Sequence, residues 1–145
     1  MTGATPVMLG WLQRALRHEF AASRQFTLQA VVARELGDSA LAGECEASAA
    51  EELRHAQLFA AALAQAGAAF GDGAVACLPI GRSWAELVGH ARTTEAAAVR
   101  LYRDAARVCQ GVPALRGLFE SIGAEEAAHY EQLTQRLRRA GQLAG

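Results

Sequence analysis

The chain has 145 residues, of which 52% are apolar, so it is long enough to bury one core and needs no second domain. Its 14 basic residues nearly balance 15 acidic ones, and both kinds are spread along the chain, which argues against a basic surface for nucleic acid. No apolar run approaches the ~18 residues of a membrane span, and the first residues lack the features of a secretory signal. We expect one cytoplasmic domain over residues 1–145, with neither nucleic-acid nor membrane partners.

The composition favours helices, because alanine supplies 34 residues and there are only three prolines. The three cysteines, Cys45, Cys77 and Cys109, form neither a CxxC pair nor an even disulfide set. We expect them to be small buried apolar side chains in a reducing compartment, and not metal ligands.

Start and stop signals divide the chain into four long helices. Thr5 and Pro6 place a capping hydroxyl before a proline, and Gly37 is a typical helix stop. A capping box begins at Ser83, and Pro113 begins the last helix after a short turn. The expected helices cover about residues 6–36, 39–66, 83–110 and 113–140.

The segment between the second and third helices differs from the rest. Residues 67–81 contain four glycines and one proline and show no helical period. The segment is long enough to run the length of a bundle, and the four helices carry apolar or small residues at alternating steps of three and four. We therefore predict an all-α four-helix bundle with a long crossover between helices two and three.

One level of these helices departs from the apolar pattern. Six ionisable side chains fall on inward-facing positions: Glu19, Glu52, His55, Glu95, Glu126 and His129. Glu19 and Glu52 lie 18 and 15 residues from Gly37, so at ~1.5 Å per residue they meet within about one helical turn in an antiparallel hairpin. Glu95 and Glu126 converge in the same way. The chain thus repeats one hairpin, in which a Glu is followed by Glu-x-x-His.

Four carboxylates cannot share a dry core without compensation, because buried like charges are costly. Two divalent cations would offset them, and Glu-x-x-His presents an oxygen and a nitrogen on one helix face. Carboxylate and imidazole ligands suit iron and manganese alike. A single motif would fit a buried polar network or a surface pair equally well, but the complete set predicts a di-metal centre. A vestigial site in a protein-binding bundle is a third alternative.

Several segments carry a family resemblance: LGWLQRALRHEFAASRQF, EELRHAQ, LPIG and EEAAHYEQL. With the six inward residues, they resemble the ferritin-like superfamily and, within it, bacterioferritin. The resemblance implies a ferroxidase centre with two iron ions per chain, in which dioxygen or peroxide oxidises ferrous iron for storage or detoxification. It also implies roles for the ligands: bridging for Glu52 and Glu126, terminal for Glu19 and Glu95, and one metal each for His55 and His129.

The sequence departs from the family pattern at several positions. Leu53 stands where bacterioferritin has its haem-ligating Met, so we expect no haem. Ala98 replaces the second Glu of rubrerythrin, a di-iron peroxidase, which favours the bacterioferritin side. Ala47 replaces a histidine of the cage's inner surface. Cage-forming members add a fifth helix beyond the position that aligns with Gly145. We expect a homo-oligomer that is at least a dimer, and the sequence does not decide between a cage and a smaller assembly.

These departures leave an alternative function, a non-storing di-iron or di-manganese oxidase or a rubrerythrin-like peroxidase. Tyr102 takes the place symmetric to a family tyrosine that is Phe26 here. Tyr102 either donates a hydrogen bond or an electron near the centre, or is a core aromatic whose hydroxyl is satisfied elsewhere. We expect His18 and His90 at surface or interface positions. Glu51 and Glu125 each directly precede a ligand Glu; the alternatives for them are carboxylates that support the site or line a channel, and solvated side chains, of which we expect the second.

Overall fold

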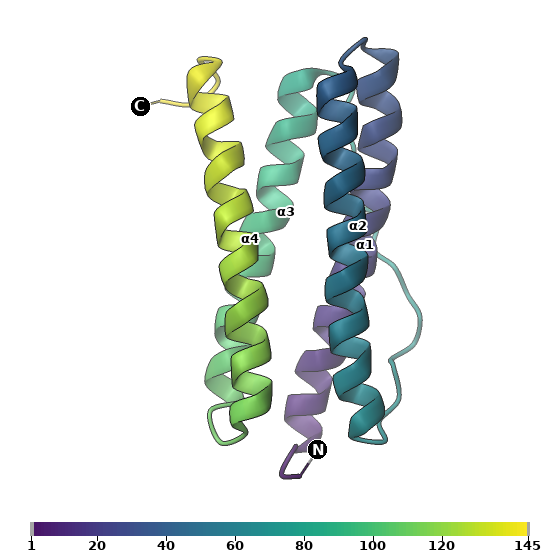
Figure 1. Ribbon diagram of the computed structural model, residues 1–145, viewed down its shortest axis with the longest axis vertical. Helices are drawn as coiled ribbons and strands as arrows, with labels where there is room; N and C mark the ends of the chain where they lie inside the picture. The colour runs from purple at the N-terminus through teal and green to yellow at the C-terminus, as the bar shows by residue number, and fades with distance from the viewer. Residues whose placement is uncertain (1, 145) are drawn as a thin grey trace.

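The computed structural model describes residues 2–144 and contains four long helices, with no strand in that range. The helices are α1 (Pro6–Glu35), α2 (Ser39–Gln65), α3 (Trp84–Val108) and α4 (Pro113–Arg139). In Figure 1, α1 and α2 form one antiparallel hairpin and α3 and α4 form another. The predicted all-α four-helix bundle is confirmed.

Polar caps fix the starts of the helices. The Asp38 carboxylate accepts a hydrogen bond from the backbone N–H of Leu41 at 2.9 Å, and the Ser83 hydroxyl accepts one from Glu86 at 3.2 Å. The capping box at Ser83 is modified, because the Glu86 carboxylate accepts from the N–H of Arg82, one residue further back, at 2.7 Å. The cap thereby also holds the last residues of the crossover.

The crossover between α2 and α3 runs along the bundle, so α3 starts at the same end as α2 (Figure 1). Its backbone is held by long polar side chains of α1. Gln25 donates to the Pro79 carbonyl at 2.8 Å, and Gln29 donates to the Ile80 carbonyl at 2.9 Å. Both glutamines are fully buried, so they satisfy carbonyls that would otherwise lack a partner inside the protein.

The apolar core is divided by the level of the inward-facing carboxylates. On one side, the rings of Phe59, Tyr102 and Phe119 pack with centroids 5.3 to 6.1 Å apart. On the other side, Leu87 of α3 and Leu137 of α4 belong to a second buried cluster. The polar side chains therefore lie between two apolar layers.

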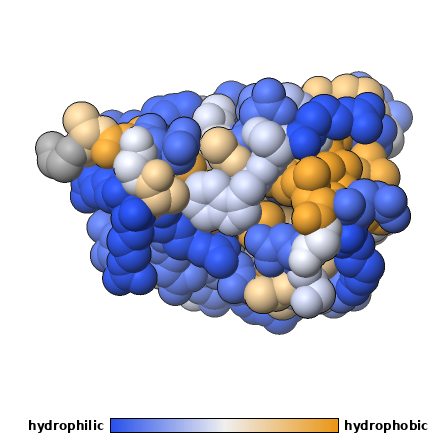
Figure 2. Space-filling view, turned by 90° about the horizontal axis from the view of Figure 1, so that it is seen from above, coloured by the Kyte–Doolittle hydropathy of each residue, from blue (hydrophilic) through white to orange (hydrophobic). Residues whose placement is uncertain are grey.

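Two of the three cysteines occupy the positions expected of them. Cys45 and Cys109 are buried, but Cys77 is exposed, because it lies in the crossover where no helical stripe turns it inward. No helix within residues 2–144 is both long and apolar enough to span a membrane. Figure 2 looks onto the bundle end where α1 turns into α2, which is largely hydrophilic with an apolar area to one side.

Candidate metal centre

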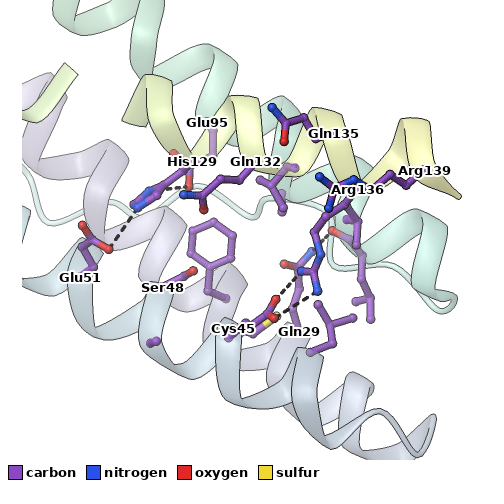
Figure 3. A pocket seen from close by; sticks show the side chains of 18 residues that line it. Gln29, Cys45, Ser48, Glu51, Glu95, His129, Gln132, Gln135, Arg136 and Arg139 are labelled. Carbon is purple, nitrogen blue, oxygen red and sulfur yellow. Dashed lines mark hydrogen bonds and ion pairs between the residues drawn. The ribbon is translucent and has the colours of Figure 1, made fainter. Parts of the chain in front are cut away.

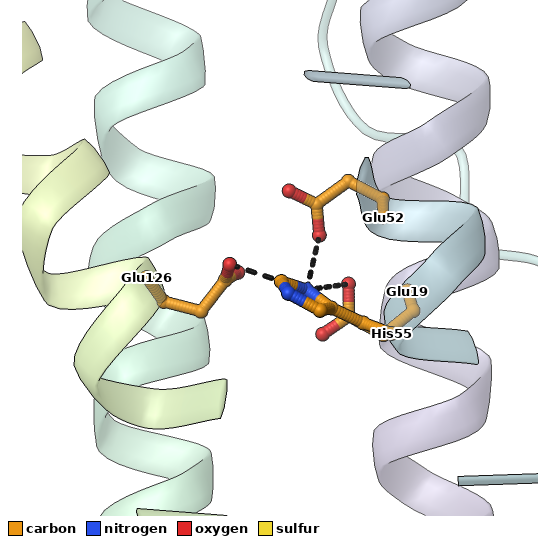
Figure 4. Close-up of side chains that lie close together, drawn as sticks. All are labelled: Glu19, Glu52, His55 and Glu126. Carbon is orange, nitrogen blue, oxygen red and sulfur yellow. Dashed lines mark ion pairs between the residues drawn. The ribbon is translucent and has the colours of Figure 1, made fainter. Parts of the chain in front are cut away.

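The six inward-facing residues meet in the middle of the bundle as two overlapping groups of potential metal ligands. Each group offers four ligand atoms that lie within 4.8 Å of one another. The first group, drawn in Figure 4, is Glu19, Glu52, His55 and Glu126, and the second is Glu52, Glu95, Glu126 and His129. Glu52 and Glu126 belong to both groups, which is the arrangement that bridging carboxylates require.

The two histidines direct the same ring nitrogen toward the carboxylates. His55 Nδ1 lies 3.6 Å from a Glu52 oxygen and 3.4 Å from a Glu126 oxygen. His129 Nδ1 lies 3.8 Å from Glu95 and 3.7 Å from the same Glu126 oxygen. These separations exceed a hydrogen bond and leave room for an ion between donor atoms.

The chemistry of the donor atoms fits a metal pair. Among residues 2–144, nine buried side-chain N or O atoms have no hydrogen-bond partner, and seven of them belong to the six candidate ligands. Both Glu52 oxygens and both histidine Nδ1 atoms are included. Unpaired buried polar atoms are rare and costly in folded proteins, so a cluster of seven indicates a ligand that satisfies them.

Burial sets the protonation of the carboxylates. Burial, with repulsion from neighbouring carboxylates, raises the pKa of Glu19 to about 7 and that of Glu126 to about 8. The same causes raise the pKa of Glu95 to about 12, and burial holds the pKa of Glu52 well above its usual range. Without metal, several of these groups therefore keep a proton at neutral pH, and metal ions would displace it.

The outer nitrogens of the histidines contact two further glutamates. His55 Nε2 lies 2.6 Å from Glu125, which also receives the Arg54 guanidinium at 2.5 Å. His129 Nε2 lies 3.3 Å from Glu51. A ring that donates through Nε2 to a carboxylate leaves its Nδ1 lone pair for a metal, so Glu51 and Glu125 orient the inner face of the site.

The environment of His55 and Glu125 agrees with this contact. Burial opposes the charged form of His55, but the carboxylates of Glu52 and Glu125 outweigh it and raise its pKa to about 9. Burial acts against ionisation of Glu125, yet the hydrogen bond with His55 lowers its pKa. The expected solvated positions for Glu51 and Glu125 were therefore wrong in one respect, because each carboxylate, although about one-third exposed, faces a histidine.

A signal for these glutamates is present in the sequence, since each lies four residues before a Glu-x-x-His histidine and thus on its helix face. Glu51 lies 4.0 Å from His55 of its own helix, as this spacing predicts, but the shorter contacts cross between the hairpins. Glu125 of α4 makes the short contact to His55 of α2, and Glu51 of α2 contacts His129 of α4. Sequence spacing alone would pair each glutamate within its own helix.

Tyr102 is buried, and its hydroxyl donates a hydrogen bond to Glu19. Burial and the nearby Glu19 charge raise the pKa of this phenol well above its usual value. His18 was expected at a solvated or interface position, but its ring packs edge-on against Tyr102 with centroids 6.3 Å apart, and burial lowers its pKa to about 4. Both side chains thus belong to the layer beneath Glu19.

Four long helices around such a carboxylate and histidine layer define a ferritin-like protein. The sequence matches the ferritin-like domain family over residues 10–143, and the chain belongs to that family. Among curated proteins, no significant match was found.

The fold is similar to solved bacterioferritin structures. A bacterioferritin of Mycobacterium tuberculosis superposes with a TM-score of 0.91 at 22% identity, over 97% of this chain and 90% of that chain. A second structure of that protein gives 0.92 at 22% identity, over 97% and 89%. The bacterioferritin of Rhodobacter capsulatus, described with a metal-free dinuclear site and haem iron, gives 0.91 at 23% identity, over 97% and 89%. At these identities the likeness establishes the fold.

Proposed function

We propose that the chain is a bacterioferritin-type ferroxidase, which binds two ferrous ions and oxidises them with dioxygen or peroxide. The observation that supports this most strongly is the pair of four-residue ligand groups that share Glu52 and Glu126. Manganese would fit the same donors. We further propose a homo-oligomer, at least a dimer, and no haem, because Leu53 offers no donor atom for haem iron.

In this proposal Glu52 and Glu126, which belong to both ligand groups, would hold both ions, and Glu19 and Glu95 would each hold one. Iron supplies the redox chemistry, because ferrous ions give electrons to the oxidant. His55 and His129 would be ligands through Nδ1, and the Nε2 atoms face Glu125 and Glu51, which would keep the rings oriented. The buried aromatic layer at Phe59, Tyr102 and Phe119 excludes water beneath the site.

The fate of the oxidised iron separates storage from a non-storing oxidase or peroxidase. Ala47 favours the non-storing oxidase or peroxidase. This residue is exposed on α2, and its methyl side chain has no donor atom that could bind ferric iron as it moves from the metal centre to a mineral. The two candidates share the same metal centre and differ in how many ions each subunit retains.

One titration tests the site and separates the two candidates. Ferrous iron is added aerobically to the metal-free protein while the particle mass and the iron per subunit are measured. Hundreds of ions in a large shell indicate storage, and about two per chain in a small oligomer indicate a redox enzyme. Glu52→Ala should abolish rapid oxidation in both cases, whereas Glu131→Ala, at an exposed position on α4, should retain it. Rapid oxidation by Glu52→Ala would mean that the site is misassigned.

A further inference from the structure

A cleft opens between α2 and α4 beside the candidate metal centre. The two helices each pack against their hairpin partner and stand apart from one another (Figure 1). The cleft is open to solvent along one side and has a volume of about 400 Å³, which lies within the ~300–1,000 Å³ typical of small-molecule sites. In Figure 3, Glu51, Glu95 and His129 lie at one end and Arg136 and Arg139 at the other.

The middle of the cavity is apolar, and its far end is cationic. Phe26, Leu87 and Val88 form buried walls from α1 and α3. At the far end, Arg136 is paired with Glu44, whereas no carboxylate within residues 2–144 lies within 4.0 Å of Arg139. The exposed guanidinium of Arg139 therefore carries a positive charge without an ion-pair partner in that range, at the end farthest from the carboxylates of the metal centre.

A buried polar atom in the cavity wall lacks a partner. The Gln29 amide donates through Nε2 to the carbonyls of Ile80 and Leu87, at 2.9 and 3.0 Å. Its Oε1 is buried and accepts no hydrogen bond from any residue in the described range. In Figure 3 the Gln29 side chain lies at the arginine end of the cavity. A ligand that fills the cavity would satisfy this oxygen by bringing a hydroxyl or N–H donor.

We propose that this cleft binds a small amphipathic carboxylate, with its carboxylate at Arg136 and Arg139, a nearby hydroxyl at Gln29, and its apolar body directed toward the metal centre. Arg136 and His129 are seven residues apart, about 10 Å along α4, which suits an apolar chain of about six to eight carbons. Binding of the carboxylate does not depend on the proposed function, because the cavity is formed without metal. Only the presence of metal ions beside the bound ligand rests on that function.

The test uses 3-hydroxyoctanoate as the probe and isothermal titration calorimetry on the metal-free full-length protein. We expect saturable binding, weaker binding of octanoate, which lacks the hydroxyl, and at least tenfold weaker binding of the neutral octane-1,3-diol. Arg139→Gln should weaken 3-hydroxyoctanoate binding about tenfold and leave diol binding unchanged, since a charged hydrogen bond commonly contributes that much.

A pair of matched variants tests the location. Ser48 of α2 lines the cavity, and Ala50 is exposed and is not part of its lining. Ser48→Phe fills the space and should abolish binding, while Ala50→Phe should preserve it, with circular dichroism confirming that both variants fold. If Ser48→Phe does not fold, loss of affinity in Arg139→Gln alone decides the location.

Three results would overturn the proposal: no saturable binding, equal affinity for carboxylate and diol, or unchanged binding in Arg139→Gln. Water alone would then occupy the cavity. Glu52→Ala separates this inference from the proposed function, because it should lose iron oxidation and still bind 3-hydroxyoctanoate. Failure of iron oxidation in the wild-type protein would leave this binding result intact.

Discussion

The metal-free protein should lose stability as the pH rises through neutrality. The pKa values of about 7 for Glu19, about 8 for Glu126 and about 12 for Glu95 all lie above those of an unfolded glutamate, near 4.5. His55 is also raised, from 6.5 to about 9. The folded state therefore holds more protons than the unfolded state, and the stability present at low pH is lost as the pH rises through these values.

The size of the effect follows from the number of excess protons. If only Glu95 and Glu126 keep theirs, two protons at ~1.4 kcal/mol each give a loss of about 3 kcal/mol per pH unit between about pH 6.5 and 7.5. His18, whose pKa falls to about 4, acts in the opposite direction but only between about pH 4 and 6.5. The predicted loss is a large part of the ~5–15 kcal/mol that stabilises a typical domain.

This slope is measured by urea denaturation of the chelator-treated protein at several pH values, with the protein concentration held fixed and unfolding followed by circular dichroism. Glu126→Gln removes one of the two carboxyl groups counted above and should reduce the slope by about 1.4 kcal/mol per pH unit. Glu131→Gln, at an exposed position, should leave it unchanged. Saturating manganese(II) should reverse the trend in the wild-type protein, because metal binding displaces protons and strengthens as the pH rises. A flat or rising stability without metal, or equal slopes in wild type and Glu126→Gln, would contradict this prediction.

Three further predictions concern the surroundings of the centre. Tyr102→Phe leaves a Glu19 oxygen without its donor, so the metal-free protein should lose about 1–3 kcal/mol in denaturation and oxidise iron more slowly in a single turnover; an unchanged rate would remove Tyr102 from the site. Glu125→Ala frees His55 Nε2 and should weaken metal binding ~10–100-fold, with Glu125→Gln partly restoring it; equal affinity would leave Glu125 without a positioning role. Haem added to the wild-type protein should show no shift of its Soret absorption band, because Leu53 offers no donor atom for the haem iron; a shift that saturates at a stoichiometric amount of haem would contradict the expectation of no haem.

The sequence predicts the bundle well because its signals are local. Caps such as Ser83, stops such as Gly37 and the three–four spacing of apolar residues act within one helix or one turn. The convergence of Glu19 with Glu52 followed from hairpin geometry alone. Helix length and a short turn are enough to set which residues share a level.

Features that depend on contacts between hairpins were not predictable in this way. The contact of Glu125 with His55 joins α4 to α2, and no spacing within either helix distinguishes that contact from a solvated glutamate. His18 is half-buried with the ring of Tyr102 against it, although its position falls off the inward stripe of α1. The cleft between α2 and α4 likewise arises from how the two hairpins are set apart.

In the proposed site, two metal ions bind between the hairpins and share the carboxylates of Glu52 and Glu126. Crystals of the protein grown with manganese(II) and measured by anomalous X-ray diffraction test it most directly. We expect two anomalous peaks per chain, ~3.5–4 Å apart, each within bonding distance of both Glu52 and Glu126 and of one histidine Nδ1. A single peak, no peak, or peaks outside the Glu52–Glu126 pair would contradict it.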